Sequence, residues 1–171
     1  MGYRTAWFGK WHCGEKSVAK DCGFEGFSLP GYGFSYIAGE YRDYLESKKL
    51  ERPRVKIEWS ARLLPVENKV FTIGNKESNL WGPFETTGHM LTQKEGHVSY
   101  FLSSIAIDWL ESLKPRESFL LKLELWSPHH PYHVAEPFYN SVDSNSIQLP
   151  LSFVQDLDMD MPDTFRSSVR R

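Results

Sequence analysis

Two short segments of this sequence combine backbone-restricting residues with titratable side chains, and the first is Gly9-Lys10-Trp11-His12. Glycine lets the backbone turn sharply, lysine supplies a compact positive charge for an anion, and histidine donates a hydrogen bond or transfers a proton. The structural alternative is a surface lysine and a histidine that packs beside Trp11. The tetrapeptide alone favours this alternative, because short motifs often match by chance.

The second segment is Ser127-Pro128-His129-His130-Pro131-Tyr132, in which two prolines restrict the backbone on either side of a histidine pair. A rigidly held histidine suits proton transfer or anion binding. His133 follows closely, so a histidine metal site is a second interpretation, although zinc sites use defined ligand spacings and no cysteine lies nearby. A stiffened turn with solvent-exposed histidines is the structural alternative.

Three weaker features carry less chemistry. Residues Asp156 to Asp160 resemble the start of a calcium loop but lack its glycine and closing glutamate, which favours an exposed acidic turn. The Gly31-Tyr-Gly33 pair lacks the third glycine of a dinucleotide loop. Cys13 follows His12 without an identifiable third partner for a thiol nucleophile, and Cys13 and Cys22 are compatible with one small disulfide loop or with free thiols.

The elements that must position these residues follow from periodicity. Residues 5–9 predict a short strand, residues 23–44 a loop-rich stretch, and residues 45–85 a strand pair in which Val55, Ile57 and Trp59 precede Val70, Phe71 and Ile73. A helix is predicted from Gln93 to Leu113, because Thr92 and Glu95 have capping-box spacing and apolar residues recur at three- and four-residue steps. Pro115 follows this helix.

Residues 119–126 predict a strand with a well-buried face formed by Phe119, Leu121, Leu123 and Leu125. A long helix followed by an apolar strand indicates an α/β fold, and ligands of open α/β sheets bind beyond the carboxyl ends of strands. If this strand and the strand near Phe8 are parallel neighbours, their ends open on the same edge. Lys10, His12 and His129 would then face one cleft.

Composition excludes several classes of function. The chain has 171 residues, of which 40% are hydrophobic, 25% charged and 15% aromatic, with a net charge of −2. These values suit one globular domain whose rings pack in a core or line a carbohydrate or aryl site. The charges are interspersed, so nucleic acid is not an expected partner, and no apolar run is long enough for a membrane span.

The segment Gly2-Tyr-Arg-Thr-Ala-Trp-Phe-Gly-Lys-Trp-His12 closely resembles the second signature of the sulfatase family. Leu29-Pro-Gly-Tyr-Gly33 is similar to the loop that follows this signature. Phe119 to Pro137 resembles the family's later strand, which ends in a Pro-His-x-Pro turn. The resemblance spans nearly the whole chain in the family's order and is weakest in residues 45–85.

The resemblance implies hydrolysis of a sulfate ester, either a small molecule or a sulfated carbohydrate. Lys10 would bind the sulfate oxygens and the leaving-group side, and His12 would contact the modified nucleophile and help it to expel sulfate. His129 would contact the ester near the leaving oxygen. His130 occupies the variable position of the turn and has no implied chemistry. Fixed cations and donors at these points lower the barrier, because charge develops there in the transition state.

Two parts of the family's site are missing from the sequence. The family's nucleophile is a cysteine or serine, converted to formylglycine, within Cys/Ser-x-Pro-x-Arg, and no cysteine or serine here has that complete context. The aspartate-rich segments that bind Ca²⁺ or a similar divalent metal are also absent. The resemblance thus predicts that residues 1–171 are a partial catalytic domain without the N-terminal nucleophile and metal segment or the C-terminal metal segment.

The expected fold is an incomplete alkaline-phosphatase-like α/β sheet with flanking helices. This chain alone is expected to be inactive and to expose apolar strand edges. By family, the location is the periplasm, the lysosome or the outside of the cell. Two alternatives remain open: a phosphatase or phosphonate monoester hydrolase of the same superfamily, and a non-catalytic remnant that binds carbohydrate or a partner.

Overall fold

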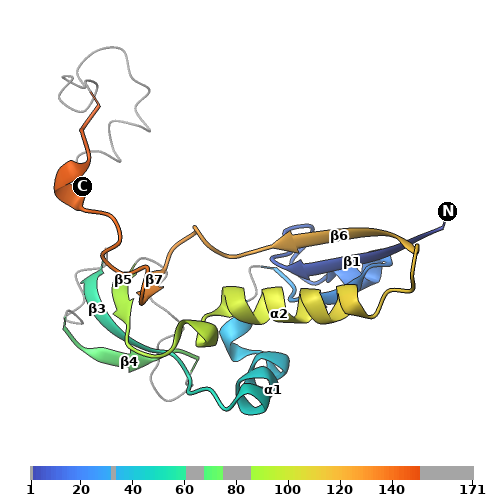
Figure 1. The fold of residues 1–171 in the computed structure, drawn as a ribbon, viewed down its shortest axis with the longest axis horizontal. Coiled ribbons are helices and arrows are strands. Elements are labelled where there is room, and N and C mark those ends of the chain that lie inside the picture. The colour runs from blue at the N-terminus through green and yellow to red at the C-terminus, as the bar shows by residue number, and fades with distance from the viewer. Residues whose placement is uncertain (1, 32–33, 61–67, 75–85, 151–171) are drawn as a thin grey trace. The chain divides into compact units, whose positions relative to one another are not determined.

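The computed structural model describes residues 2–31, 34–60, 68–74 and 86–150. The chain divides into two compact units, Met1–Tyr139 and Asn140–Arg171, which are described separately. The first unit has an α/β fold (Figure 1). Its described strands and helices are β1 (Tyr3–Gly9), β2 (Glu25–Ser28), α1 (Gly39–Lys48), β3 (Arg54–Ser60), β4 (Val70–Thr72), β5 (Thr86–Met90), α2 (Val98–Glu111), β6 (Ser118–Glu124) and β7 (Tyr132–Ala135).

The first sheet is parallel and has the strand order β2-β1-β6. Strand β1 forms where the sequence predicts a strand, although it begins at Tyr3, and it alternates buried Ala6 and Phe8 with half-buried Thr5 and Trp7. Its register with β6 runs from Tyr3 opposite Ser118 to Gly9 opposite Glu124. The prediction that these two strands are parallel neighbours is therefore confirmed, and their carboxyl ends coincide.

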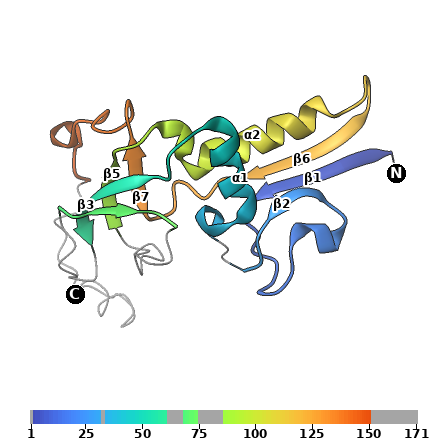
Figure 2. The same cartoon turned by 90° about the horizontal axis from the view of Figure 1, so that it is seen from below.

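Helix α2 covers one face of this sheet, and the two views show it running beside β1 and β6 (Figures 1 and 2). The contact is largely aromatic. The rings of Phe27 and Phe101 lie 5.2 Å apart, and those of Phe8 and Trp109 lie 6.4 Å apart, both in edge-to-face geometry. The helix therefore packs against the strands that lead to Lys10 and His129.

The helix starts later than the sequence predicts, at Val98 rather than Gln93. Residues 94–96 form a 3₁₀ turn instead, and the hydroxyls of Tyr41 and Tyr44 donate hydrogen bonds to the carbonyls of Gly96 and Glu95. These carbonyls are therefore held by tyrosines of α1. The N-cap is His97, whose side chain accepts a hydrogen bond from the Ser99 amide, so the predicted Thr92 capping box does not form.

The second sheet is mixed and has the order β4-β3-β5-β7. Strands β3 and β4 are the antiparallel pair that the sequence predicts, and β5 pairs with β7 in parallel. Val55 and Ile57 are buried, whereas Trp59 is exposed, because the register of β3 against β5 shifts between Ile57 and Trp59. Two of the three apolar residues that mark this strand in the sequence are therefore buried.

Two expectations about buried surface and loops are wrong. The stretch at residues 23–44 contains β2, a 3₁₀ turn and the start of α1, whose buried residues are mostly tyrosines. Strand β6 lacks the predicted well-buried face: Phe119 is 46% and Leu123 38% exposed, and only Leu121 and Leu125 pack against the core. The reason is that β6 is the edge strand of its sheet in the described structure.

The second unit is described only up to Pro150. A short 3₁₀ turn, Ser144–Ser146, follows Asp143, whose carboxylate accepts a hydrogen bond from the Asn145 amide at 2.9 Å. Val142, Ile147 and Leu149 are exposed around it.

Candidate functional site

The two chemistry-bearing segments leave the sheet side by side at the carboxyl ends of β1 and β6. The Lys10 amide donates a hydrogen bond to the Glu124 carbonyl at 2.9 Å. Gly9 has a φ of +108°, and a Cβ atom at this position would lie 1.9 Å from the Glu124 carbonyl oxygen. Only glycine tolerates both conditions, so Gly9 is what lets the chain turn into Lys10 while touching β6.

One pocket of about 530 Å³ opens at these strand ends, and its walls include Lys10, His12, Glu124, Trp126, Ser127 and His129. More than a hundred residues separate Lys10 and His12 from His129 in the sequence. The structure brings all three predicted site residues to this single pocket. The alternative that the two turns lie on opposite edges of the sheet is therefore excluded.

Lys10 and His129 are linked through an intervening indole ring. Lys10 Nζ lies 4.5 Å from the centre of the Trp126 ring, in cation–π geometry. That ring centre lies 5.3 Å from the centre of the His129 ring. The ammonium and the imidazole centre are thus at most about 10 Å apart, as the two distances together require. Both groups fit around one tetrahedral anion that accepts hydrogen bonds of roughly 3 Å.

The orientation of His129 follows from its hydrogen bond to the next residue. His129 Nδ1 lies 2.7 Å from the His130 carbonyl oxygen, and a carbonyl only accepts, so Nδ1 carries the proton. The same carbonyl accepts the Trp126 indole N–H at 3.0 Å, and the His129 amide donates to the Trp126 carbonyl. These hydrogen bonds within the turn hold the His129 ring in place, and Nε2 is the ring nitrogen that is available to a ligand.

His12 reaches the same pocket from the loop after β1. It is exposed, and it follows the buried Trp11, whose indole N–H donates to Ser17 Oγ at 3.1 Å. Ser17 Oγ in turn donates to the Cys13 carbonyl at 3.2 Å. Trp11 thus anchors the loop that carries His12. In this tetrapeptide Trp11 has a structural role, while Lys10 and His12 line the pocket.

Sequence reasoning missed the residues that complete the walls of this pocket. Trp126 contacts both Lys10 and His129, and Glu124 pairs with Lys122 at 2.9 Å. Trp7 lines the same pocket and donates its indole N–H to the Lys10 carbonyl. Side chains two residues apart in a strand lie on the same face, so Trp7 lies on the face of Gly9. The place of Trp7 beside the pocket could therefore have been predicted from the sequence. The position of Glu124 depends on the register of β6 and could not have been predicted in this way.

A metal centre does not fit the described residues. No group of three or more histidine, cysteine, aspartate or glutamate side chains in residues 2–31, 34–60, 68–74 and 86–150 is arranged to hold a metal ion. His133 is buried, and its Nε2 lies 3.1 Å from Thr86 Oγ1, so the interpretation of His133 as a ligand beside His129 and His130 is wrong. Asp156 to Asp160 lie outside the described residues.

The two cysteines, Cys13 and Cys22, are exposed free thiols, so the small disulfide loop that the sequence left open is not formed. Cys13 lines the pocket beside His12. No described helix is both long and apolar enough to cross a membrane.

Comparison of the chain with known proteins identifies no relative. No protein-family model matches the sequence, and searches of curated proteins and of solved structures find no significant match.

Proposed function

We propose that the pocket at the ends of β1 and β6 is the sulfate-binding part of a sulfatase active site, and that the reaction it serves is hydrolysis of a sulfate ester. The observation that carries the proposal is the convergence of Lys10, His12 and His129 on one pocket. The resemblance of Gly2 to His12 and of Phe119 to Pro137 to sulfatase segments supports the same assignment.

The charges of the pocket suit this chemistry. Lys10 supplies a fixed positive charge for the non-bridging sulfate oxygens. His129 has its Nδ1 proton committed to the His130 carbonyl, so its Nε2 donates to the ester oxygen only when the ring is protonated. In that state Nε2–H transfers its proton to the leaving oxygen as the sulfur–oxygen bond breaks. His12, which lines the same pocket, would contact the nucleophile and help it to expel sulfate.

The nucleophile and the metal of the sulfatase reaction need residues other than those described. No cysteine or serine of the chain lies in a complete Cys/Ser-x-Pro-x-Arg motif, and the described residues do not fit a Ca²⁺ site. We propose that residues 1–171 are part of an alkaline-phosphatase-like domain whose remaining segments supply both groups. The chain by itself is then not expected to turn over an aryl sulfate, with or without added Ca²⁺.

Sulfate binding by the purified chain tests this function. Trp7 and Trp126 line the pocket, so their fluorescence reports on an anion that enters it. We expect sulfate to bind at least about tenfold more weakly to Lys10→Met, because a charge-assisted hydrogen bond contributes roughly 1.5–3 kcal/mol. Lys20→Met is the matched control, since Lys20 is an exposed lysine that does not line the pocket.

Equal loss of sulfate affinity in both lysine variants would indicate non-specific attraction and would contradict the site. Inorganic phosphate at the same ionic strength separates the sulfatase from the phosphatase alternative. A clear preference of the wild-type chain for phosphate over sulfate would favour the phosphatase.

A further inference from the structure

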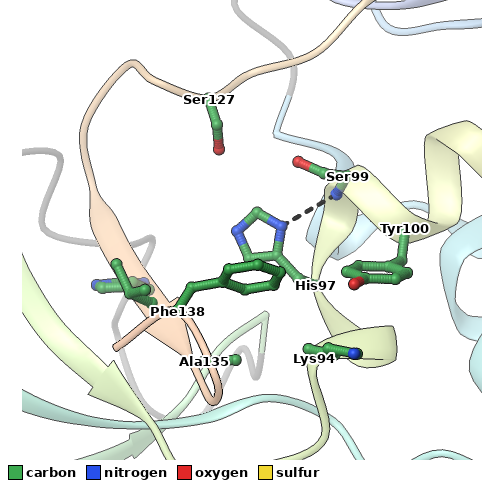
Figure 3. A pocket seen from close by; sticks show the side chains of 9 residues that line it. Lys94, His97, Ser99, Tyr100, Ser127, Ala135 and Phe138 are labelled. Carbon is green, nitrogen blue, oxygen red and sulfur yellow. Dashed lines mark hydrogen bonds between the residues drawn. The ribbon is translucent and has the colours of Figure 1, made fainter. Parts of the chain in front are cut away.

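A second, smaller pocket of about 260 Å³ lies between the start of α2 and β7 (Figure 3). Its walls include Lys94, His97, Tyr100, Ser127, Ala135 and Phe138. Figure 3 shows the His97 ring in the middle of this group, with the Phe138 ring beside it and the Ser127 hydroxyl directed toward it. Ser127 also lines the candidate sulfate pocket, so the two pockets adjoin at this residue.

The protonation of His97 is fixed by its role at the helix start. Its Nδ1 accepts a hydrogen bond from the Ser99 amide at 3.1 Å, so the proton of the neutral ring is on Nε2. Burial lowers the pKa of His97 to about 4, which keeps the ring neutral near pH 7. Nε2–H has no hydrogen-bond partner among the described residues. The pocket therefore contains an N–H donor of fixed orientation to which no described residue offers an acceptor.

The remaining walls define what this donor would meet. Tyr100, Val134, Ala135 and Phe138 provide aromatic and aliphatic surface. Lys94 Nζ lies 6.0 Å from the Phe138 ring centre and contributes a positive charge. None of the described residues that line the pocket is acidic. A volume below that of most drug-sized ligand sites limits the occupant to about one ring.

We propose that this pocket binds a small aromatic carboxylate, with its ring between the apolar walls and its carboxylate directed to His97 Nε2–H, while Lys94 adds a positive charge to the pocket wall. The donor, the cation and the lack of carboxylates among the described lining residues favour an anion, and the aromatic walls favour a planar ring. This site uses neither Lys10 nor His129, so it is independent of the proposed sulfatase function.

Titration calorimetry with benzoate as the probe tests the proposal, and benzylamine and acetate are the matched controls. Benzoate is expected to bind at least about tenfold more tightly than benzylamine, which has the wrong charge, and than acetate, which has no ring. Lys10→Met is expected to leave benzoate binding unchanged, which separates this site from the sulfate pocket.

Two variants locate the binding. His97→Asn keeps a side chain that caps α2 but removes the Nε2–H donor, and Phe138→Ala removes an aromatic wall at a position that is 54% exposed. Each is expected to weaken benzoate binding by about tenfold, with circular dichroism confirming that the helix remains. Unchanged affinity in both variants, or equal affinity for benzoate and benzylamine, would overturn the proposal.

Discussion

At the scale of single residues, the candidate site depends on the direction in which His129 presents its ring. The carbonyl of His130 fixes the proton on Nδ1, and the His130 side chain itself has no role in this assignment. The sulfatase resemblance already gave a role to His129 and none to His130. The structure adds that the carbonyl of His130 orients the His129 ring.

The orientation of His129 predicts opposite behaviour for two substitutions. The amide of glutamine reaches approximately the place of Nε2, whereas that of asparagine reaches the place of Nδ1. We expect His129→Gln, which keeps an N–H donor near the place of Nε2, to retain most of the sulfate affinity and His129→Asn to lose about tenfold. Calorimetric titration with sulfate measures both, and equal affinities for the two variants would contradict the assigned orientation.

Gly9 is the residue on which the approach of β1 to β6 depends. Gly9→Ala would place a methyl group against the Glu124 carbonyl oxygen and would force an alanine into a positive φ, so the strand ends must separate. We expect a loss of about 3 kcal/mol in the free energy of unfolding, because steric overlap adds to backbone strain. Urea denaturation measures it, and Gly2→Ala is the control, since a Cβ at Gly2 would touch nothing within 4 Å. A loss no larger than that of the control would show that the close approach is not required.

At the scale of elements, β6 is both the support of the site and the exposed edge of its sheet. In the described structure no strand pairs with its outer side, and Leu120 is 55% exposed. An unpaired edge with apolar side chains is a template for association with another chain.

We therefore expect the isolated chain to self-associate through β6, and Leu120→Lys to shift it toward the monomer because a charge on an edge strand opposes pairing. Val142→Lys is the matched control, since Val142 is equally apolar, is exposed, and lies outside β6. Sedimentation velocity distinguishes the three proteins. A monomeric wild-type chain at high concentration would show that the edge is not a docking surface.

The sequence predicted the elements whose side chains repeat regularly and missed those that depend on contacts elsewhere. β1, the β3–β4 pair and the body of α2 follow from periodicity. β5 contains Gly88, which weakens a strand signal, yet a Cβ there would lie 2.5 Å from the Lys56 carbonyl oxygen, so the neighbouring strand demands glycine. α1 buries Tyr41 and Tyr44 rather than an aliphatic stripe.

The candidate site was predicted to a similar extent. Residue type and position at strand ends drew attention to Lys10, His12 and His129, and the sulfatase resemblance selected them as the candidate site. Trp126 and Glu124 were not predicted, because their places depend on the register of β6 against β1. The helix predicted from Gln93 to Leu113 has His97 in its first turns, whereas His97 is the N-cap of α2, because tyrosines of α1 hold the preceding residues in a 3₁₀ turn.

At the scale of the whole unit from Met1 to Tyr139, one hydrophobic core contains side chains of both sheets. Two histidines lie close to this core. Burial lowers the pKa of His97 to about 4, and burial followed by the charge of His97 lowers the pKa of His133 to about 4. Below pH 6.5 the unfolded chain therefore takes up protons that the folded chain does not.

This difference predicts that stability is complete above about pH 6.5 and falls as the pH decreases toward 4, by a few kcal/mol for the two residues together. His133→Gln retains a hydrogen-bonding group for Thr86 but does not titrate. The free energy of unfolding of this variant is therefore expected to fall less steeply between pH 6.5 and pH 4 than that of the wild-type chain. Urea denaturation between pH 7 and pH 4.5 measures both slopes. The hydrogen bond from Arg4 lowers the pKa of Glu25 from 4.5 to about 2, so the stability that Glu25 contributes begins to fall only near pH 4.5, at the lower end of this range. Identical slopes in the two proteins would show that His133 is not the cause.

The central claim is that Lys10, His12 and His129 form one anion site. Nuclear magnetic resonance of the isotope-labelled chain, prepared with Leu120→Lys if it self-associates, tests this claim most directly during titration with sodium sulfate against sodium chloride at matched ionic strength. We predict saturable shifts of the Lys10 side chain, of both histidine rings and of the Trp126 indole, with one common dissociation constant. Shifts spread over exposed lysines such as Lys16 and Lys20, or different dissociation constants for the Lys10 and His129 signals, would contradict the account.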